Sequence, residues 1–273
     1  ANRMKLILMT VPYFFIEEHQ ILTALFDEGL EVLHLRKPGT EPIYSERLLT
    51  LIPECYRKRI VVHDHFYLKN EYKLMGIHLN QRNPEPPAGY KGHISCSCHT
   101  IEEVKAQKTV CNYVLLSPIF NSISKQGYES PFTDKVLKQY AAQGWIDRKV
   151  MALGGITLDN IARVQSYGFG GAIVLGDIWN HSHDNDYKDL ITHFRKLQKA
   201  VDNKPTHLIT TSAMNDNSFM VFSGTKSRYL AEKICASLGC PLGNLVITHF
   251  ADGEFAVSYE ESIRGRDVFL AQS

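Results

Sequence analysis

Val150-Met-Ala-Leu-Gly-Gly-Ile-Thr157 is the clearest change from strand to helix character in the sequence. A short apolar run without polar alternation is typical of a strand that is buried on both faces of a sheet. The two glycines that end the run fit a tight turn into residues 158–167, where apolar side chains recur at helical spacing. We interpret this stretch as one strand, one turn and the start of one helix.

The same unit recurs along the first 200 residues. The predicted strands are Leu6–Val11, Val32–Arg36, Ile60–His63, Gly76–Leu79, His93–Ser97, Tyr113–Ile119, Val150–Gly154 and Ala172–Leu175. Amphipathic segments between and after them predict helices over Glu18–Leu30, Glu46–Arg57, Ile101–Lys108, Asp134–Gln143, Leu158–Tyr167 and Tyr187–Val201. Strict alternation of this kind requires parallel strands, and eight units predict an α/β fold of the TIM (β/α)₈ barrel type. An open doubly wound sheet is the main alternative, but no GxGxxG follows the first strand.

The pattern changes after Asp202. Residues 203–218 are polar and predict a linker, and residues 219–273 predict a short, incomplete α/β fragment that is marginal by itself. Its expected elements are strands at Phe219–Phe222, Leu245–Phe250, Ala256–Tyr259 and Val268–Leu270, and a helix at Ser227–Leu238. We therefore expect a barrel domain over residues 4–202, with residues 1–3 as an expression remnant or upstream readthrough.

Composition narrows the class of protein. The 273 residues are 44% hydrophobic and 22% charged, which is typical of a globular protein, and the net charge is +1. No overall field directs such a chain to nucleic acid or to an anionic membrane, so we expect neither as a partner. The sequence has no apolar run of membrane-spanning length and no signal peptide pattern, and its six cysteines form no regular framework. We expect a cytoplasmic protein with reduced thiols, whose apolar outer helices are compatible with a homo-oligomer.

Glycines stand where the last two predicted strands end. Gly154 and Gly155 follow the seventh strand, and Leu175 and Gly176 end the eighth. Loops at these two places bind phosphate in many TIM barrels, and bare amides at a helix N-terminus attract anions. We favour a phosphate site over the alternative, in which the glycines only allow tight turns.

Basic side chains are predicted at the same rim. Arg36 and Lys37 follow the second strand, and Lys125 lies after the sixth strand in a loop that also carries Ser122 and Ser124. Several cations beside two glycine turns indicate a site for more than one phosphate group. The predicted ligands are therefore small phosphorylated molecules.

A possible metal site follows the third strand at His63-Asp64-His65, near Gly76-Ile-His-Leu79 of the fourth strand. The histidines are compatible with zinc, but a rim that binds phosphates favours a hard cation with oxygen ligands. We favour Mg²⁺ at Asp64, where one or two carboxylates commonly share the ion with substrate phosphates.

These residues together resemble thiamine phosphate synthase, over Met4 to about Val201. The similar motifs are Leu33-His-Leu-Arg36, His63-Asp64, Gly76-Ile-His-Leu79, Ser97 before Cys98-His99-Thr100, Pro118-Ile-Phe120 with Ser122-Ile-Ser-Lys125, and Gly154-Gly-Ile156. The resemblance implies a transferase of thiamine biosynthesis that joins hydroxymethylpyrimidine diphosphate to thiazole phosphate. Pyrophosphate leaves first in such enzymes, and the thiazole nitrogen captures the pyrimidine-methyl cation.

The resemblance also implies roles for individual residues. Arg36, His63 and Lys125 would contact the diphosphate, Asp64 would hold Mg²⁺, and Ser97 would seat the pyrimidine. The thiazole phosphate would be lined by Ser122, Ser124, Gly154, Gly155, Leu175 and Gly176. Arg36, Asp64 and Lys125 are the expected catalytic residues.

The sequence departs from the family pattern at several of these positions. His34 replaces a glutamine and Pro38 a lysine around Arg36, so Lys37 is expected to compensate for the lost cation. His63 replaces an asparagine. Asn83 replaces the second magnesium aspartate, which leaves one carboxylate and weakens Mg²⁺ binding unless the diphosphate supplies the missing charge.

Two other functions stay open because of these departures. The sister family of thiazole tautomerases moves a proton on a thiazole carboxylate phosphate without a metal. A resemblance to that family would imply a histidine at the position that Pro118 occupies here. Since Pro118 is retained, we favour the synthase. The third interpretation is a non-catalytic barrel that binds phosphorylated ligands.

The C-terminal segment resembles the beginning of ribose-phosphate pyrophosphokinase. The similar stretches are Phe222-Ser-Gly-Thr-Lys-Ser-Arg-Tyr-Leu-Ala231, His249-Phe-Ala-Asp-Gly-Glu254 and Glu261-Ser-Ile-Arg-Gly265. The resemblance implies an adenine-contacting strip at Phe250, Asp252 and Glu254, but the ribose-phosphate and pyrophosphate loops are missing. We therefore predict no kinase activity, and a fusion artefact is the favoured interpretation over a protein with two activities.

Overall fold

The computed structural model describes residues 3–121, 130–182, 186–202, 219–224, 227–238, 240–249, 255–260 and 267–271. The chain divides into two compact units, whose described parts are residues 3–202 and 219–271. Residues 203–218, the predicted linker, lie outside the described residues, so that boundary stays a prediction.

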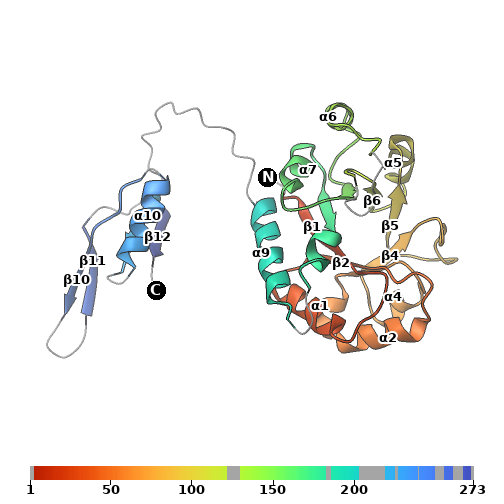
Figure 1. Ribbon diagram of the computed structural model, residues 1–273, viewed down its shortest axis with the longest axis horizontal. Coiled ribbons are helices and arrows are strands. Elements are labelled where there is room, and N and C mark those ends of the chain that lie inside the picture. Colours follow the sequence, from red (N-terminus) through yellow and green to blue (C-terminus); the bar gives the residue numbers. More distant parts are fainter. Residues whose placement is uncertain are drawn as a thin grey trace. The chain divides into compact units, whose positions relative to one another are not determined.

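The first unit is a closed barrel of eight parallel strands, as predicted (Figure 1). The strands are β1 (Lys5–Met9), β2 (Val32–Leu35), β3 (Ile60–Val62), β4 (Gly76–Leu79), β5 (His93–Cys98), β6 (Tyr113–Leu116), β7 (Val150–Leu153) and β8 (Gly171–Val174). Each strand pairs with its sequence neighbour, and β8 closes the barrel on β1 with Leu6 opposite Ala172. Seven strands lie within two residues of their predicted positions, and β6 ends three residues before the predicted Ile119.

Helices cover the outside of this barrel (Figure 1). They are α1 (Glu18–Asp27), α2 (Pro42–Leu51), α3 (Glu54–Arg57), α4 (Leu68–Glu71), α5 (Ile101–Gln107), α6 (Asp134–Ala142), α7 (Ile161–Ser166), α8 (Gly176–Trp179) and α9 (Lys188–Asp202). Among the described ranges, no helix is long and apolar enough to cross a membrane.

The predicted continuous helix over Glu46–Arg57 is wrong. The structure has two helices there, because α2 ends before Ile52 and α3 begins after Pro53. Proline cannot donate the backbone hydrogen bond of a helix interior, and it forces the preceding residue into extended geometry. Ile52 accordingly has a ψ of 132°.

The helix after β7 begins later than the predicted Leu158. Asn160 precedes the first turn of α7, its Oδ1 accepts a hydrogen bond from the Thr157 backbone N–H at 2.8 Å, and its Nδ2 donates to the Gly155 carbonyl at 2.8 Å. Asn160 thus joins the glycine turn to the helix, and the turn is separated from α7 by five residues.

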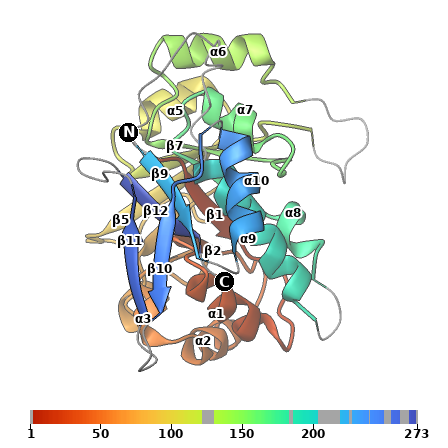
Figure 2. The ribbon, with the colours of Figure 1, turned by 90° about the vertical axis from the view of Figure 1, so that its left-hand side faces the viewer.

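The second unit contains β9 (Phe219–Ser223), α10 (Arg228–Leu238), β10 (Leu245–His249), β11 (Phe255–Tyr259) and β12 (Asp267–Ala271). All five agree with the predicted elements to within one residue. β9 pairs with β12 in parallel, and β10 pairs with β11 antiparallel, which Figure 2 shows beside α10. Two sheets of two strands each bury little surface.

Candidate active site

A pocket of about 620 Å³ opens at the carboxyl ends of the barrel strands. It is lined by Met9, Arg36, His63, Leu79, Asn80, Gln81, Arg82, Pro84, Cys96, Ser97, His99, Glu103, Gln107 and Leu153. Most of these residues end a strand or follow one directly, which is the usual place of the active site in a TIM barrel. Three of the predicted site residues, Arg36, His63 and Ser97, line this pocket.

Asp64 and Asn83 lie side by side, as expected for residues that share a ligand. The Asn83 Nδ2 donates to Asp64 Oδ1 at 3.1 Å and to the His63 carbonyl at 3.0 Å. Arg82 also donates to both Asp64 oxygens, at 3.1 and 3.2 Å. The Asp64 carboxylate, 17% exposed, therefore already faces a cation.

Arg36 and Arg82 give the pocket a positive charge. Burial lowers the pKa of Arg36, the nearby Arg82 lowers it further, and Asp64 opposes the change. A guanidinium stays protonated in spite of such changes because its ordinary pKa exceeds 12. Our sequence interpretation did not select Arg82, although the polar run Asn80-Gln81-Arg82-Asn83 directly after β4 contained the signal.

Lys37 has a different partner from the expected one. Its Nζ donates to Glu18 of α1 at 2.5 and 2.8 Å and to the Tyr13 carbonyl at 2.6 Å, and both side chains of the ion pair are almost fully buried. Burial raises the pKa of Glu18 to about 7, although Lys37 opposes the change. Lys37 does not line the pocket, so its predicted contact with substrate has no support from its position.

The glycine turn after β7 has the geometry that only glycine adopts easily. Gly154 has a φ of 105° and Gly155 a φ of 63°. A Cβ at Gly155 would lie 2.7 Å from the Asn121 carbonyl oxygen, and one at Gly154 would lie 2.9 Å from the Pro118 Cα. The turn after β7 therefore packs directly against the segment after β6.

The corresponding turn after β8 begins a short helix. Gly176 is the first residue of α8, and Leu175 precedes it. Asp177 of the same helix accepts a hydrogen bond from the Leu158 backbone N–H at 3.0 Å, which ties the two rim segments together. The remaining predicted residues, Ser122, Ser124 and Lys125, lie outside the described residues.

Below the pocket, the barrel lumen contains buried imidazoles. His34 Nδ1 lies 2.8 Å from His63 Nε2, and His34 Nε2 lies 2.6 Å from the Tyr113 hydroxyl. His78 lies between Ser95 and Ser97, with 2.8 Å from each ring nitrogen to a serine Oγ. Burial lowers the pKa of His34 and His63 well below the usual value and that of His78 to about 3, so these rings are neutral at pH 7.

The family model described as thiamine monophosphate synthase matches residues 8–178, which is more than half of the chain. The chain belongs to this family. The thiamine-phosphate synthase of Levilactobacillus brevis is 26% identical over 180 residues, covering 61% of this chain and 82% of that protein. The resemblance inferred from the sequence motifs is thus confirmed.

Solved structures agree with the family. The crystal structure of thiamine phosphate pyrophosphorylase from Bacteroides thetaiotaomicron is 55% identical, with a TM-score of 0.68, and the match covers 73% of this chain and 98% of that one. A thiamine phosphate pyrophosphorylase from Pyrococcus furiosus matches 74% of this chain with a TM-score of 0.59 at 18% identity, which supports the fold alone.

The segment that follows the barrel matches a second family model. That model is described as the N-terminal domain of ribose phosphate pyrophosphokinase and matches residues 219–273. The ribose-phosphate pyrophosphokinase of Porphyromonas gingivalis is 83% identical over 59 residues, which are 22% of this chain and 19% of that enzyme. The chain thus spans about a fifth of the length of that relative.

Proposed function

We propose that the barrel is a thiamine phosphate synthase, which joins hydroxymethylpyrimidine diphosphate to thiazole phosphate and releases pyrophosphate. The observation that carries the proposal is that Arg36 and Arg82 line one pocket at the barrel mouth, where Arg82 also pairs with Asp64. In this reaction the methylene C–O bond breaks and its electron pair leaves with the pyrophosphate. The thiazole nitrogen lone pair then forms the new C–N bond, so the protein has to neutralise charge rather than remove a proton.

Two guanidinium groups fit that requirement. Arg36 and Arg82 can each donate two parallel hydrogen bonds to phosphate oxygens, and they stabilise the negative charge that grows on the leaving group. His63 lines the same wall as a neutral donor, and Ser97 Oγ, held by His78 at 2.8 Å, is available to orient the pyrimidine. We assign the diphosphate to this side of the pocket.

Asp64 and Asn83 are suited to hold Mg²⁺. Their polar atoms lie 3.1 Å apart, and a half-turn of the amide would present its oxygen beside the carboxylate. When bound there, the ion would neutralise phosphate charge. One or two carboxylates together with substrate phosphates are a common ligand set for Mg²⁺. Arg82 would give up its contacts with Asp64 and turn to the diphosphate.

The other substrate fits the opposite rim. Gly154 and Gly155 form the partly buried turn after β7 and have no side chains of their own to block an anion, and Gly176 begins α8 beside Leu175. We propose that these residues, with Ser122 and Ser124, bind the thiazole phosphate, and that Lys125 contacts the diphosphate. The six cysteines are free thiols, which supports a reducing compartment such as the cytoplasm, and a homo-oligomer stays a prediction.

The test is to incubate the purified full chain with both phosphorylated substrates, with and without Mg²⁺, and to measure thiamine phosphate. We expect product only with the metal, and Arg36→Met should lower kcat/KM by about 10²–10³-fold, the usual effect of losing one charge-stabilising donor. The matched control is Arg47→Met, on the exposed face of α2, which should keep wild-type activity. Absence of product with wild type, or equal activity in the two variants, would overturn the proposal.

One observation favours a second candidate, the thiazole tautomerase. His99 lines the pocket, and its Nδ1 lies 3.1 Å from the carbonyl of Ser117, directly before Pro118. An imidazole at this place can move a proton. Exchange of substrate protons with solvent without coupling, lost in His99→Gln and independent of Mg²⁺, would support this candidate over the synthase.

We propose that the C-terminal segment has no kinase activity, because it corresponds to about a fifth of its pyrophosphokinase relative. Incubation of the full chain with ATP and ribose 5-phosphate should yield no phosphoribosyl diphosphate. Formation of that product above a heat-inactivated control would contradict this proposal.

A further inference from the structure

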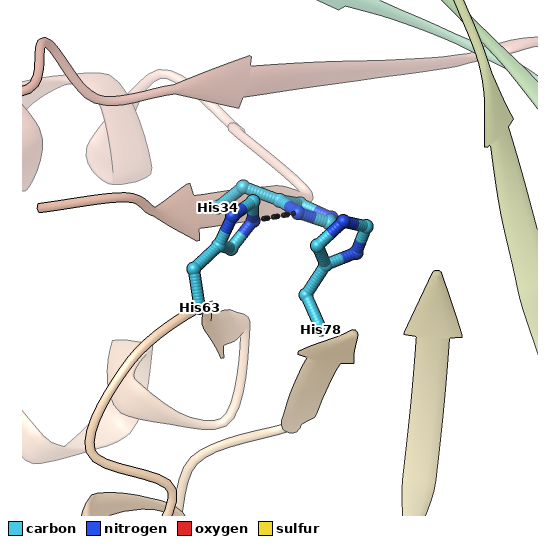
Figure 3. Close-up of side chains that lie close together, drawn as sticks. All are labelled: His34, His63 and His78. Carbon is cyan, nitrogen blue, oxygen red and sulfur yellow. Dashed lines mark hydrogen bonds between the residues drawn. The ribbon is translucent and has the colours of Figure 1, made fainter. Parts of the chain in front are cut away.

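We infer that His34, His63 and His78 form a binding site for a transition-metal ion of the zinc class, in the barrel lumen beneath the pocket. The three side chains come from neighbouring strands: His34 lies in β2, His63 directly follows β3, and His78 lies in β4. Figure 3 shows the three rings pointing toward one another. This site differs from the proposed Mg²⁺ position, which has oxygen ligands.

The spacing of the rings suits one ion. One nitrogen from each residue lies within 4.8 Å of one in each of the others, and the ring centroids are 4.2 to 5.3 Å apart. Zinc–nitrogen bonds of about 2.0–2.1 Å place tetrahedral ligand nitrogens about 3.4 Å apart. The closest pair, at 2.8 Å between His34 and His63, needs to separate by only a few tenths of an ångström.

The opposite nitrogens of two rings are already held. His34 Nε2 lies against the Tyr113 hydroxyl at 2.6 Å, and His78 Nδ1 lies against Ser95 Oγ at 2.8 Å. Metal-binding histidines usually have such a partner on the second nitrogen, because it fixes the tautomer and the ring orientation. His34 Nδ1 and His78 Nε2 are then the ligand atoms, and His78 Nε2 has to exchange its contact with Ser97 Oγ, 2.8 Å away, for the ion.

His63 supplies an independent observation. Its Nδ1 is buried and has no hydrogen-bond partner in the described part of the chain. A buried polar atom without a partner is unfavourable and calls for a ligand, a water or an ion. Nε2 of the same ring faces His34 Nδ1 and is the third ligand atom, and since no described group holds the ring at Nδ1, His63 can adjust to an ion.

The surroundings favour an imidazole-seeking metal. The lumen of a TIM barrel is normally filled by branched apolar side chains, whereas here one level holds three fully or almost fully buried imidazoles. Neutral imidazoles suit Zn²⁺, Ni²⁺ and Cu²⁺, whereas Mg²⁺ prefers oxygen. Three protein ligands leave a fourth position, and because His63 lines the pocket, an oxygen from water or phosphate can fill it.

The experiment is to dialyse the full chain against buffered Zn²⁺ and to measure the bound metal by mass spectrometry. A second cluster, Asp177, His181 and His193, could also hold an ion, so all proteins carry His181→Gln. We expect this protein to bind one equivalent of Zn²⁺ tightly. The affinity for Zn²⁺ should fall by more than about 100-fold in His34→Gln and in His78→Gln, which exceeds the usual effect of losing a residue that only hydrogen-bonds a ligand. His65→Gln is the matched control. Like His63, His65 follows β3, but its Nε2 contacts the Thr40 carbonyl, so this variant should still bind one tight equivalent of Zn²⁺.

Three further measurements keep the test decisive if a variant fails to fold. Zinc-edge X-ray absorption of the His181→Gln protein loaded with one equivalent of Zn²⁺ should show three imidazole ligands and one oxygen at the ion. Ser95→Ala should weaken binding by about 10-fold, the effect of losing an outer partner, and excess Mg²⁺ should not displace the ion. No tight equivalent, or fewer than three imidazoles around it, would overturn the inference. Because the readout is metal content, the result does not depend on whether the protein makes thiamine phosphate.

Discussion

The two faces of the barrel sheet differ in chemistry. The outer face packs against the helices in one large apolar cluster that includes Leu22, Leu33 and Val62, and the Glu18–Lys37 ion pair is buried beside α1. The lumen has a smaller apolar cluster, with Ile7, Met9, Met151 and Ile173 on β1, β7 and β8 and with Val32, Val61 and Leu115 on β2, β3 and β6. Polar side chains stand beside it on the side from β2 to β6: His34, His63, His78, His93, Ser95, Ser97 and Tyr113.

The difference separates stability from function. The outer layer joins sheet and helices by burying apolar surface, which is the dominant favourable term in folding. The polar side of the lumen gives up such burial and needs hydrogen bonds for every ring. Side chains that cost stability there lie directly under the pocket, where they can contact substrates or an ion.

The largest effect is expected at the buried ion pair of the outer layer. Lys37→Met leaves Glu18 without its partner, and the free energy of unfolding should fall by about 3–5 kcal/mol. The double variant Glu18→Leu with Lys37→Met should regain most of that stability, because no charge stays buried. Denaturant unfolding measures both. Full stability in Lys37→Met would mean that Lys37 is free to contact substrate, as the sequence alone predicted.

The next largest effect concerns the apolar packing of the outer layer. Leu22 in α1 is fully buried, and Leu22→Ala should lower the free energy of unfolding by about 2–5 kcal/mol through lost burial and a cavity. Substrate turnover at 25 °C should stay within twofold of wild type, since the pocket lies on the other face of the sheet. A selective loss of turnover in a folded variant would contradict the division between the two faces.

The histidines of the lumen predict a dependence of stability on pH, measured with a chelator present. The folded pKa of His78 is about 3, below its unfolded value, so protons bind the unfolded chain more strongly and stability falls as pH falls below about 6.5. Between pH 6.5 and 5, His78 alone should cost about 1.6 kcal/mol, because the slope rises from half of about 1.36 kcal/mol per pH unit at pH 6.5 to almost the full value at pH 5. His78→Gln should lack this contribution in denaturant unfolding at both pH values. An unchanged pH slope in that variant would show that His78 is protonated in the folded state.

The smallest effect is expected at Ser97, between the lumen and the pocket. Ser97→Ala removes a hydroxyl that lies 2.8 Å from His78 Nε2, which should lower the free energy of unfolding by about 1 kcal/mol. If Ser97 orients the pyrimidine, KM for that substrate should rise more than kcat changes. A variant with unaltered KM would restrict Ser97 to supporting His78.

Local patterns predicted most of the fold. Apolar runs such as Tyr113–Leu116 and glycine turns such as Gly154-Gly155 specify strand and turn by short-range physics, and the eight strands follow in the predicted order. Helix ends were less accurate. The interruption at Pro53 was readable from the sequence, whereas the late start of α7 depends on contacts that Asn160 makes with the turn.

By itself, the sequence determined the parallel barrel and the grouping of Arg36, Asp64 and Asn83 at the end where the pocket opens, because strand order and chain direction place these residues together. Tertiary structure alone decided that Lys37 turns to Glu18, that Arg82 joins Asp64, and that three histidines from separate strands meet in the lumen. The physical reason is that burial and pairing depend on residues far apart in the chain. A single strand shows which side chains share a face, but only the closed sheet shows which of them touch.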